Sequence, residues 1–261
     1  MSDQPSATQV LADLSAAADA AARALAATPD WGETGGRPGE HHSDVAADAA
    51  AVAVLEAAGY GVLSEETGRS GEHRPVTVVL DPLDGSTNAS RLMGWWAVSL
   101  CAVDVEGPWV ALVVDLRHGT RYHATRGGGA FRDGEPIAAS GRTRLAECIV
   151  GVNGIPPAAP GWAQYRAFGA AALDLCAVAD GTLDGYLDAT VDEHGSWDYL
   201  GGQLVCQEAG ATVVDAAGRD LVVLEHGARR TPVAGATAEV CAALVALHPH
   251  HGGRRADQAL P

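Results

Sequence analysis

The sequence contains no lysine, so arginine and histidine supply every basic side chain. Its 261 residues include 17 Lys and Arg against 33 Asp and Glu, which gives a formal net charge of −16. Nucleic acids and anionic membrane surfaces are bound largely through neutralisation of their phosphates, and a surface of this sign opposes such binding. We therefore expect neither nucleic acid nor membrane as a partner.

Long apolar runs and a secretion signal are also missing. No run approaches the ~18 apolar residues that a membrane-spanning helix needs. Residues 1–27 are rich in alanine, carry three aspartates and lack the basic segment and apolar stretch of a signal peptide. These absences lead us to expect a cytoplasmic protein.

Cysteine is scarce and scattered. The five cysteines lie mostly inside apolar runs, and their number is odd. Neither a disulfide framework nor the close ligand spacing of a zinc site follows from this pattern. We expect reduced cysteines in the core.

Apolar periodicity predicts helices and strands in alternation, with no internal repeat. Helical spacing is found over 10–18, 44–58, 169–179, 199–208 and 236–247, and strand-like runs over 76–80, 97–103, 109–115, 120–125, 148–152, 182–187, 212–214 and 222–224. This alternation favours a layered α/β fold. We predict an N-terminal subdomain over 1–141, a C-terminal subdomain over 142–247 and a disordered tail over 248–261.

The most informative segment is Asp81-Pro-Leu-Asp84-Gly85-Ser86-Thr-Asn88, which follows the apolar run 76–80. Two carboxylates at the end of a buried strand can hold hard divalent cations, and the N–H groups at a helix start can hold an anion. A metal beside a phosphate indicates phosphate-ester chemistry. The same residue types are also ordinary in turns and helix caps, so the segment alone leaves both interpretations open.

Two further segments strengthen the interpretation of 81–88 as a metal and phosphate site. Leu63-Ser-Glu65-Glu-Thr-Gly68 lies upstream, and Trp197-Asp198 is followed by an apolar run and Glu208-Ala-Gly210 downstream. Together the three segments resemble the signatures of the inositol monophosphatase family. The segments 126–131 and 166–173 also resemble that family, in the expected order, so the resemblance covers about 44–242.

The resemblance implies a fold of alternating helix and sheet layers, an αβαβα sandwich of the inositol monophosphatase and fructose-1,6-bisphosphatase type. It also implies two or three Mg²⁺ ions and inhibition by lithium. The metal ligands it implies are Glu65, Asp81, the Leu83 carbonyl, Asp84 and Asp198. The catalytic residues it implies are Glu65 and Ser86, which would activate a water together with the metal, and Asp48, which would support the Ser86 hydroxyl.

For substrate binding, the resemblance implies a set of residues that surrounds these metal ligands. Its members are Asp84, Gly85, Ser86, Gly169, Ala170, Ala171, Asp188 and Asp198. The chain departs from the family pattern in five places. It has Ser86 for a common Thr, Ala89 for an aromatic residue, His41 and His42 for a basic residue, Asp188 for a common Glu, and extra residues at 189–196. The inserted Asp192, Glu193 and His194 form either a solvated loop or a substrate contact.

The expected function is hydrolysis of a small polyol or sugar phosphate, with inositol 1-phosphate as the first candidate. Other substrates in the same superfamily are fructose 1,6-bisphosphate, histidinol phosphate and 3′-phosphoadenosine 5′-phosphate. A metal- or phosphate-binding relative without catalysis is the alternative of another class. The resemblance also leads us to expect a homodimer.

Overall fold

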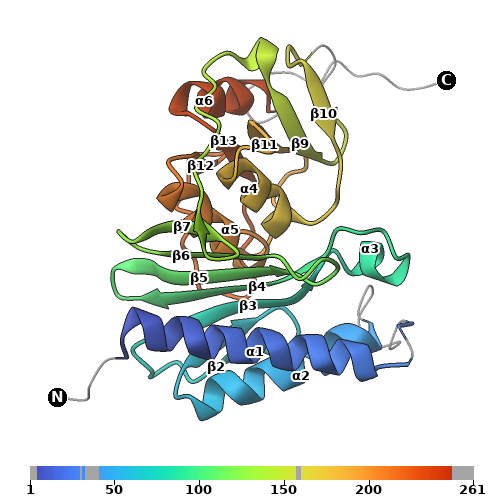
Figure 1. Cartoon of the computed structure of the whole chain (residues 1–261), viewed down its shortest axis with the longest axis vertical. Coiled ribbons are helices and arrows are strands. Elements are labelled where there is room, and N and C mark those ends of the chain that lie inside the picture. The colour runs from blue at the N-terminus through green and yellow to red at the C-terminus, as the bar shows by residue number, and fades with distance from the viewer. Residues whose placement is uncertain (1–4, 30, 33–40, 157–159, 249–261) are drawn as a thin grey trace.

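The structure is a computed structural model that describes residues 5–29, 31–32, 41–156 and 160–248. Figure 1 shows five layers stacked from the N-terminal helices to α6: a helix pair, a large sheet, a second helix pair, a smaller sheet and a last helix. This confirms the layered αβαβα sandwich.

The first layer consists of α1 (Ala7–Ala27) and α2 (His42–Ala57). Ser6 caps α1, because its hydroxyl accepts a hydrogen bond from Gln9 N at 3.2 Å. Leu14 and Leu55 are fully buried in the apolar cluster that these helices share with the large sheet.

The large sheet has eight strands in the order β2-β1-β3-β4-β5-β6-β7-β8. They are β1 (Gly61–Ser64), β2 (Gly68–Ser70), β3 (Thr77–Asp84), β4 (Ala97–Asp104), β5 (Gly107–Asp115), β6 (Arg121–Thr125), β7 (Gly129–Arg132) and β8 (Glu135–Pro136). Strands β1 and β3 are parallel neighbours, whereas β3 to β8 form an antiparallel meander. Both faces of the sheet are covered by helices, which explains the continuous apolar runs of its central strands.

Strand β3 runs farther than the apolar pattern predicts. The predicted strand ends at Leu80, but β3 continues to Asp84, with a register shift against β4 between Asp81 and Asp84. Pro82 lies at this irregularity and has no N–H to donate to the ladder. The carboxylates of Asp81 and Asp84 therefore belong to the last four residues of the strand itself. The short helix α3 (Ser86–Ser90) follows.

The second half of the chain builds the remaining three layers. The helices are α4 (Ala171–Ala179) and α5 (Ser196–Glu208) between the sheets, η1 (Leu145–Glu147), and α6 (Ala238–Leu247) on the outer face. The smaller sheet has the order β10-β9-β11-β13-β12. Its strands are β9 (Ile149–Asn153), β10 (Gln164–Arg166), β11 (Gly185–Asp188), β12 (Thr212–Asp215) and β13 (Pro232–Gly235).

Several elements of this half differ from prediction, and β10 is one that the sequence pattern does not predict. Residues 222–224 are not a strand, because Val222 N donates to Asp220 Oδ1 at 2.9 Å and the backbone turns there. The place beside β12 belongs instead to β13, which the sequence pattern does not predict. The predicted boundary between 141 and 142 falls between β8 and β9, and the division into subdomains stays a prediction.

The C-terminal prediction needs one correction. His248, assigned above to a disordered tail, is fully buried, and its Nε2 lies 2.9 Å from the Thr190 carbonyl. Residues 249–261 lie outside the described part of the chain. Within the described ranges, no helix has the length and apolar character required to cross a bilayer.

The expectation for cysteine is confirmed. All five cysteines are buried and free of disulfides. They pack as small apolar side chains, and burial raises the pKa of the Cys148 and Cys241 thiols to about 11.

The packing of α1 against the large sheet can be tested by mutation. Leu14→Ala removes a fully buried side chain between α1 and the sheet, and we expect it to lower the free energy of unfolding by about 2–5 kcal/mol. Ile155→Ala is the matched control, since Ile155 is 89% exposed. Urea unfolding of both variants checks this, and equal losses would contradict the assigned packing.

Candidate metal and phosphate site

Four acidic side chains from three separate segments converge at one end of the large sheet. Asp81 and Asp84 lie on β3, Glu65 follows β1, and Asp198 lies in the first turn of α5. Because β1 and β3 are parallel and pair Ser64 with Leu80, their ends meet at the same edge; Glu65 N donates to the Leu80 carbonyl at 3.3 Å. Asp81 and Asp84 are buried, and the other two are half-buried.

Backbone N–H groups orient three of these carboxylates. Asp81 Oδ1 accepts from Leu83 N at 2.9 Å, and Asp84 Oδ2 accepts from Ala172 N, in the first turn of α4, at 2.7 Å. Asp198 Oδ2 accepts from Gly195 N at 2.7 Å, at the N-terminus of α5. Such bonds fix the carboxylates and leave other oxygen lone pairs for ligands.

Burial raises the pKa of all four acids, and the charges of neighbouring acids add to this rise in three of them. Burial and then the charge of Asp198 raise the pKa of Glu65 to about 8 and that of Asp84 to about 7. Burial and the charges of Glu65, Asp84 and Asp198 hold the pKa of Asp81 well above its usual range. Burial also raises the pKa of Asp198, although a hydrogen bond with Asp81 opposes this rise. The cluster therefore favours protons or cations.

The donor chemistry of this cluster fits hard divalent cations. Carboxylate oxygens are the ligands that Mg²⁺ prefers, and clustered acids with raised pKa values gain the most from a nearby positive charge. In the described ranges, no three His, Cys, Asp or Glu side chains are arranged to hold one ion as they stand. The hydrogen bond between Asp81 and Asp198 is consistent with this, because it takes up oxygens that an ion would otherwise contact.

The structure brings the predicted phosphate segment against the acid cluster. Gly85 has a φ of 85°, in the left-handed region, and a Cβ there would lie 3.1 Å from Ala170 Cβ and 3.3 Å from the Gly169 carbonyl. Ser86 is half-buried at the start of α3. Asn88 links the two segments, since its Nδ2 donates to the Phe168 carbonyl at 2.6 Å.

Asp48 lies in a different setting from the one that the resemblance implies. Its carboxylate accepts hydrogen bonds from the hydroxyls of Ser64 and Thr67, which flank Glu65 in sequence. Asp48 is 2% exposed. It thus anchors the turn that carries Glu65, and the support of Ser86 by Asp48 stays a prediction.

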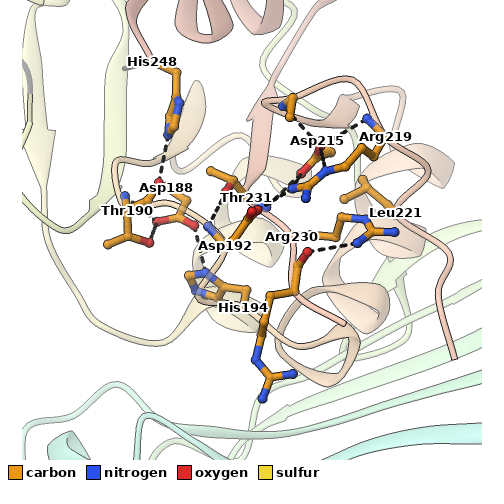
Figure 2. Close-up of polar contacts among 12 residues, drawn as sticks. Asp188, Thr190, Asp192, His194, Asp215, Arg219, Leu221, Arg230, Thr231 and His248 are labelled. Atoms are coloured by element: carbon orange, nitrogen blue, oxygen red, sulfur yellow. Dashed lines mark hydrogen bonds and ion pairs between the residues drawn. The ribbon is translucent and has the colours of Figure 1, made fainter. Parts of the chain in front are cut away.

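Asp188 is enclosed by protein donors. Its Oδ1 accepts from Thr190 N, Thr190 Oγ1 and Asn153 Nδ2 at 3.0, 2.6 and 3.1 Å. Its Oδ2 lies 2.9 Å from His194 Nδ1, and the side chain has no exposed surface. Protein donors thus surround Asp188, as Figure 2 shows for Thr190 and His194, and its contact with substrate stays a prediction.

Sequence reasoning did not identify several neighbours of the acid cluster. Buried Asp174, on α4, accepts a hydrogen bond from Trp95 Nε1 at 3.0 Å, and the charge of Asp84 contributes to its raised pKa after burial. The Arg229 guanidinium lies 5.0 Å from the centre of the Trp197 ring, which His226 also contacts. No spacing in the sequence links these residues, because each comes from a different element.

The sequence model of the inositol monophosphatase family matches residues 42–249. The chain therefore belongs to the inositol monophosphatase family, which is a family of phosphatases.

Individual relatives agree with this assignment. The inositol-1-monophosphatase of Mesorhizobium japonicum is 34% identical over 177 residues, covering 61% of this chain and 65% of that protein. The Nus factor SuhB of Xylella fastidiosa is 33% identical over 176 residues, covering 62% of each chain. The match thus spans less than two thirds of either curated relative. The crystal structure of the extragenic suppressor protein suhB from Bartonella henselae has a TM-score of 0.77 and 26% identity, covering 91% of this chain and 97% of that one.

The raised pKa values predict how the stability of the metal-free protein depends on pH. Glu65 has a pKa of about 8 when folded, against 4.5 ordinarily, so the folded state binds more protons. In chelator, we therefore expect the free energy of unfolding to fall as pH rises from about 4.5 to about 8. Asp84→Asn should make this slope shallower, because it removes one of the repelling charges.

Thermal unfolding in chelator across this pH range measures the slope. Asp133→Asn is the matched control, because Asp133 lies in an exposed turn with a φ of 51° that Asn tolerates. The control should keep the wild-type slope. A flat or rising stability in the wild type would contradict the electrostatic account of the cluster.

Proposed function

We propose that this chain is a Mg²⁺-dependent phosphomonoesterase that hydrolyses a small polyol or sugar phosphate, with inositol 1-phosphate as the first substrate to test. The observation that carries this proposal is the convergence of Glu65, Asp81, Asp84 and Asp198 beside the Gly85-Ser86 turn. Membership of a phosphatase family supports it.

The metal ligands in this proposal are the four carboxylates and the Leu83 carbonyl, which together would hold two or three Mg²⁺ ions. When bound, Mg²⁺ would offset the charge of the phosphate and of the developing leaving group, and would make a water more acidic. The carboxylates are held by backbone N–H groups at 2.7–2.9 Å, which supplies a rigid ligand set. Inhibition by lithium is part of the same proposal.

Glu65 and Ser86 orient the attacking water, and the Glu65 carboxylate accepts its proton. Glu65 suits this role, because the parallel pairing of β1 and β3 places it beside the two carboxylates of β3, where the metal would hold the water. Asp48 acts indirectly, since it holds the hydroxyls of Ser64 and Thr67 on either side of the Glu65 turn. Support of the Ser86 hydroxyl by Asp48 remains part of the proposal.

Substrate recognition divides between backbone and carboxylate groups. The N–H groups of Gly85 and Ser86 bind phosphate oxygens, and substrate hydroxyls donate to Asp84 and Asp198. The backbone of 169–171 completes the binding surface, because Gly169 and Ala170 pack within 3.3 Å of a Cβ built on Gly85. Carboxylate acceptors suit a ligand with several hydroxyl groups.

A second candidate is a metal- or phosphate-binding protein without catalysis. One relative, in Xylella fastidiosa, is named a Nus factor rather than a phosphatase. Ala89, which is 1% exposed, also stands where relatives carry a larger aromatic side chain. Mg²⁺ binding without phosphate release from any ester would favour this candidate over the phosphatase.

Asp81→Asn tests the phosphatase proposal. Phosphate release from a panel of inositol, sugar, histidinol and nucleotide phosphates is measured with Mg²⁺ and with chelator. We expect chelator-sensitive turnover in the wild type and a loss of about a thousandfold in the variant, roughly 4 kcal/mol of transition-state stabilisation. Asp133→Asn is again the control, and near-normal turnover by Asp81→Asn would place the reaction elsewhere.

The proposed assembly is a homodimer. Leu92 and Met93 follow α3 and are 76% and 55% exposed, so this segment presents apolar surface that a second copy could cover. We expect sedimentation at micromolar concentration to show a dimer and Met93→Asp to shift it toward monomer. A wild-type monomer at that concentration would contradict this part of the proposal.

A further inference from the structure

The side chain of Trp95 is held by two residues that lie far from it in the sequence. Its Nε1 donates a hydrogen bond to Asp174 Oδ1 at 3.0 Å, and Asp174 is a buried residue of α4. The indole also packs against Phe168, with 4.6 Å between the ring centroids. These contacts fix the indole to α4 and to the segment that precedes it.

The backbone of Trp95 contacts the predicted phosphate-binding turn, residues 85–88. Its carbonyl accepts a hydrogen bond from Asn88 Nδ2 at 2.8 Å, and a Cβ built on Gly85 would lie 3.0 Å from that oxygen. The same Asn88 amide donates to the Phe168 carbonyl at 2.6 Å. The turn therefore lies directly against the Trp95 carbonyl, with no space for a side chain between them.

The main chain that leads to Trp95 has little support from the sheet. Residues 91–94 are exposed, and Leu92 has a φ of 57°, in the left-handed region that leucine seldom adopts. The first residue of β4 is Ala97, so the ladder of the large sheet does not hold Trp95. Since the strand begins later, the contacts of the Trp95 side chain determine where its carbonyl lies.

The hydrogen bond to Asp174 is important because other side chains do not enclose the indole completely. Trp95 lies beside a cavity of about 340 Å³, which Leu173 of α4 also lines. The first turn of α4 in addition orients Asp84, through the hydrogen bond from Ala172 N at 2.7 Å. One helix therefore holds both a carboxylate of the acid cluster and the indole that adjoins the phosphate-binding turn.

We propose that Trp95 is a positioning residue for phosphate binding, an inference that rests on the phosphate site of the proposed function. Its carbonyl holds the turn 85–88 so that the N–H groups of the turn face the phosphate oxygens, while Asp174 and Phe168 hold its ring. Without the indole the turn shifts, and its N–H groups lose their alignment with the phosphate. The role requires a ring at 95 and a hydrogen-bond acceptor at 174, but no charge at 174.

Binding of inorganic phosphate tests the proposal without requiring turnover. Isothermal titration calorimetry in excess Mg²⁺ compares the wild type with Trp95→Ala. We expect the Kd for phosphate to rise about tenfold or more in the variant, because misaligned N–H donors lose most of their hydrogen-bond energy. A wild-type Kd in Trp95→Ala would overturn the proposal.

Trp96→Ala is the matched control. Trp96 is the neighbouring tryptophan and is buried, but it packs in the apolar cluster that the large sheet shares with α1 and α2. We expect this variant to lose stability in urea and to keep the wild-type Kd for phosphate. A rise in Kd as large as that of Trp95→Ala would show a general effect of lost packing and would overturn the proposal.

Two variants of Asp174 test the anchor of the indole, also if Trp95→Ala does not fold. Asp174→Asn and Asp174→Leu both remove the charge near Asp84, but only Asn keeps an acceptor for Trp95 Nε1. We therefore expect Asp174→Leu to bind phosphate about tenfold more weakly than Asp174→Asn. Equal Kd values for the two variants would contradict the positioning role of this hydrogen bond.

The same titration separates this inference from the proposed function. A wild type that binds phosphate but releases none from any ester would overturn the phosphatase proposal, and the Kd comparison would still decide the role of Trp95. A wild type that binds no phosphate in Mg²⁺ would overturn both. A wild type that hydrolyses esters, together with an unchanged Kd in Trp95→Ala, would overturn this inference alone.

Discussion

Mutual repulsion among buried carboxylates is the constraint on which the rest of this structure depends. Glu65, Asp81, Asp84 and Asp198 come from three segments; burial raises the pKa of each, and the charges of neighbouring acids raise it further for Glu65, Asp81 and Asp84. Isolated in water these groups would separate, so the surrounding layers must hold them together. The covered large sheet, the bulge in β3 and the starts of α4 and α5 supply that restraint through backbone N–H groups. A cluster of buried carboxylates held in this way favours the binding of protons or cations at this edge of the large sheet.

Much of this arrangement could be predicted from the sequence, because each signature is local. The order of the acidic segments along the chain indicated the family, and alternating periodicities indicated the layers. The end of β3 was harder to predict: the apolar run stops at Leu80, while the strand continues through polar residues up to Asp84. Hydrophobic periodicity does not identify strand residues whose side chains are polar and form a functional site rather than the core.

Contacts between distant segments account for what the sequence did not predict. Asp48 hydrogen-bonds to Ser64 and Thr67 rather than lying free on α2, and Asp188 is enclosed by donors from β9 and the insertion. The position of His194 depends on its backbone pairing with Arg230, in the loop before β13. The sequence of that loop has no hydrophobic periodicity that would indicate this contact. These relations arise from tertiary packing, so spacing along one segment carries no signal of them.

The most direct test of the account is a crystal structure of the protein with Mn²⁺, an anomalous scatterer that takes the same oxygen ligands as Mg²⁺. The account predicts at least two ions whose ligands come from Glu65, Asp81, Asp84 and Asp198, with the hydrogen bond between Asp81 and Asp198 replaced by metal contacts. Anomalous peaks only at other places, or none at millimolar Mn²⁺, would contradict the assignment of this acid cluster as the metal centre.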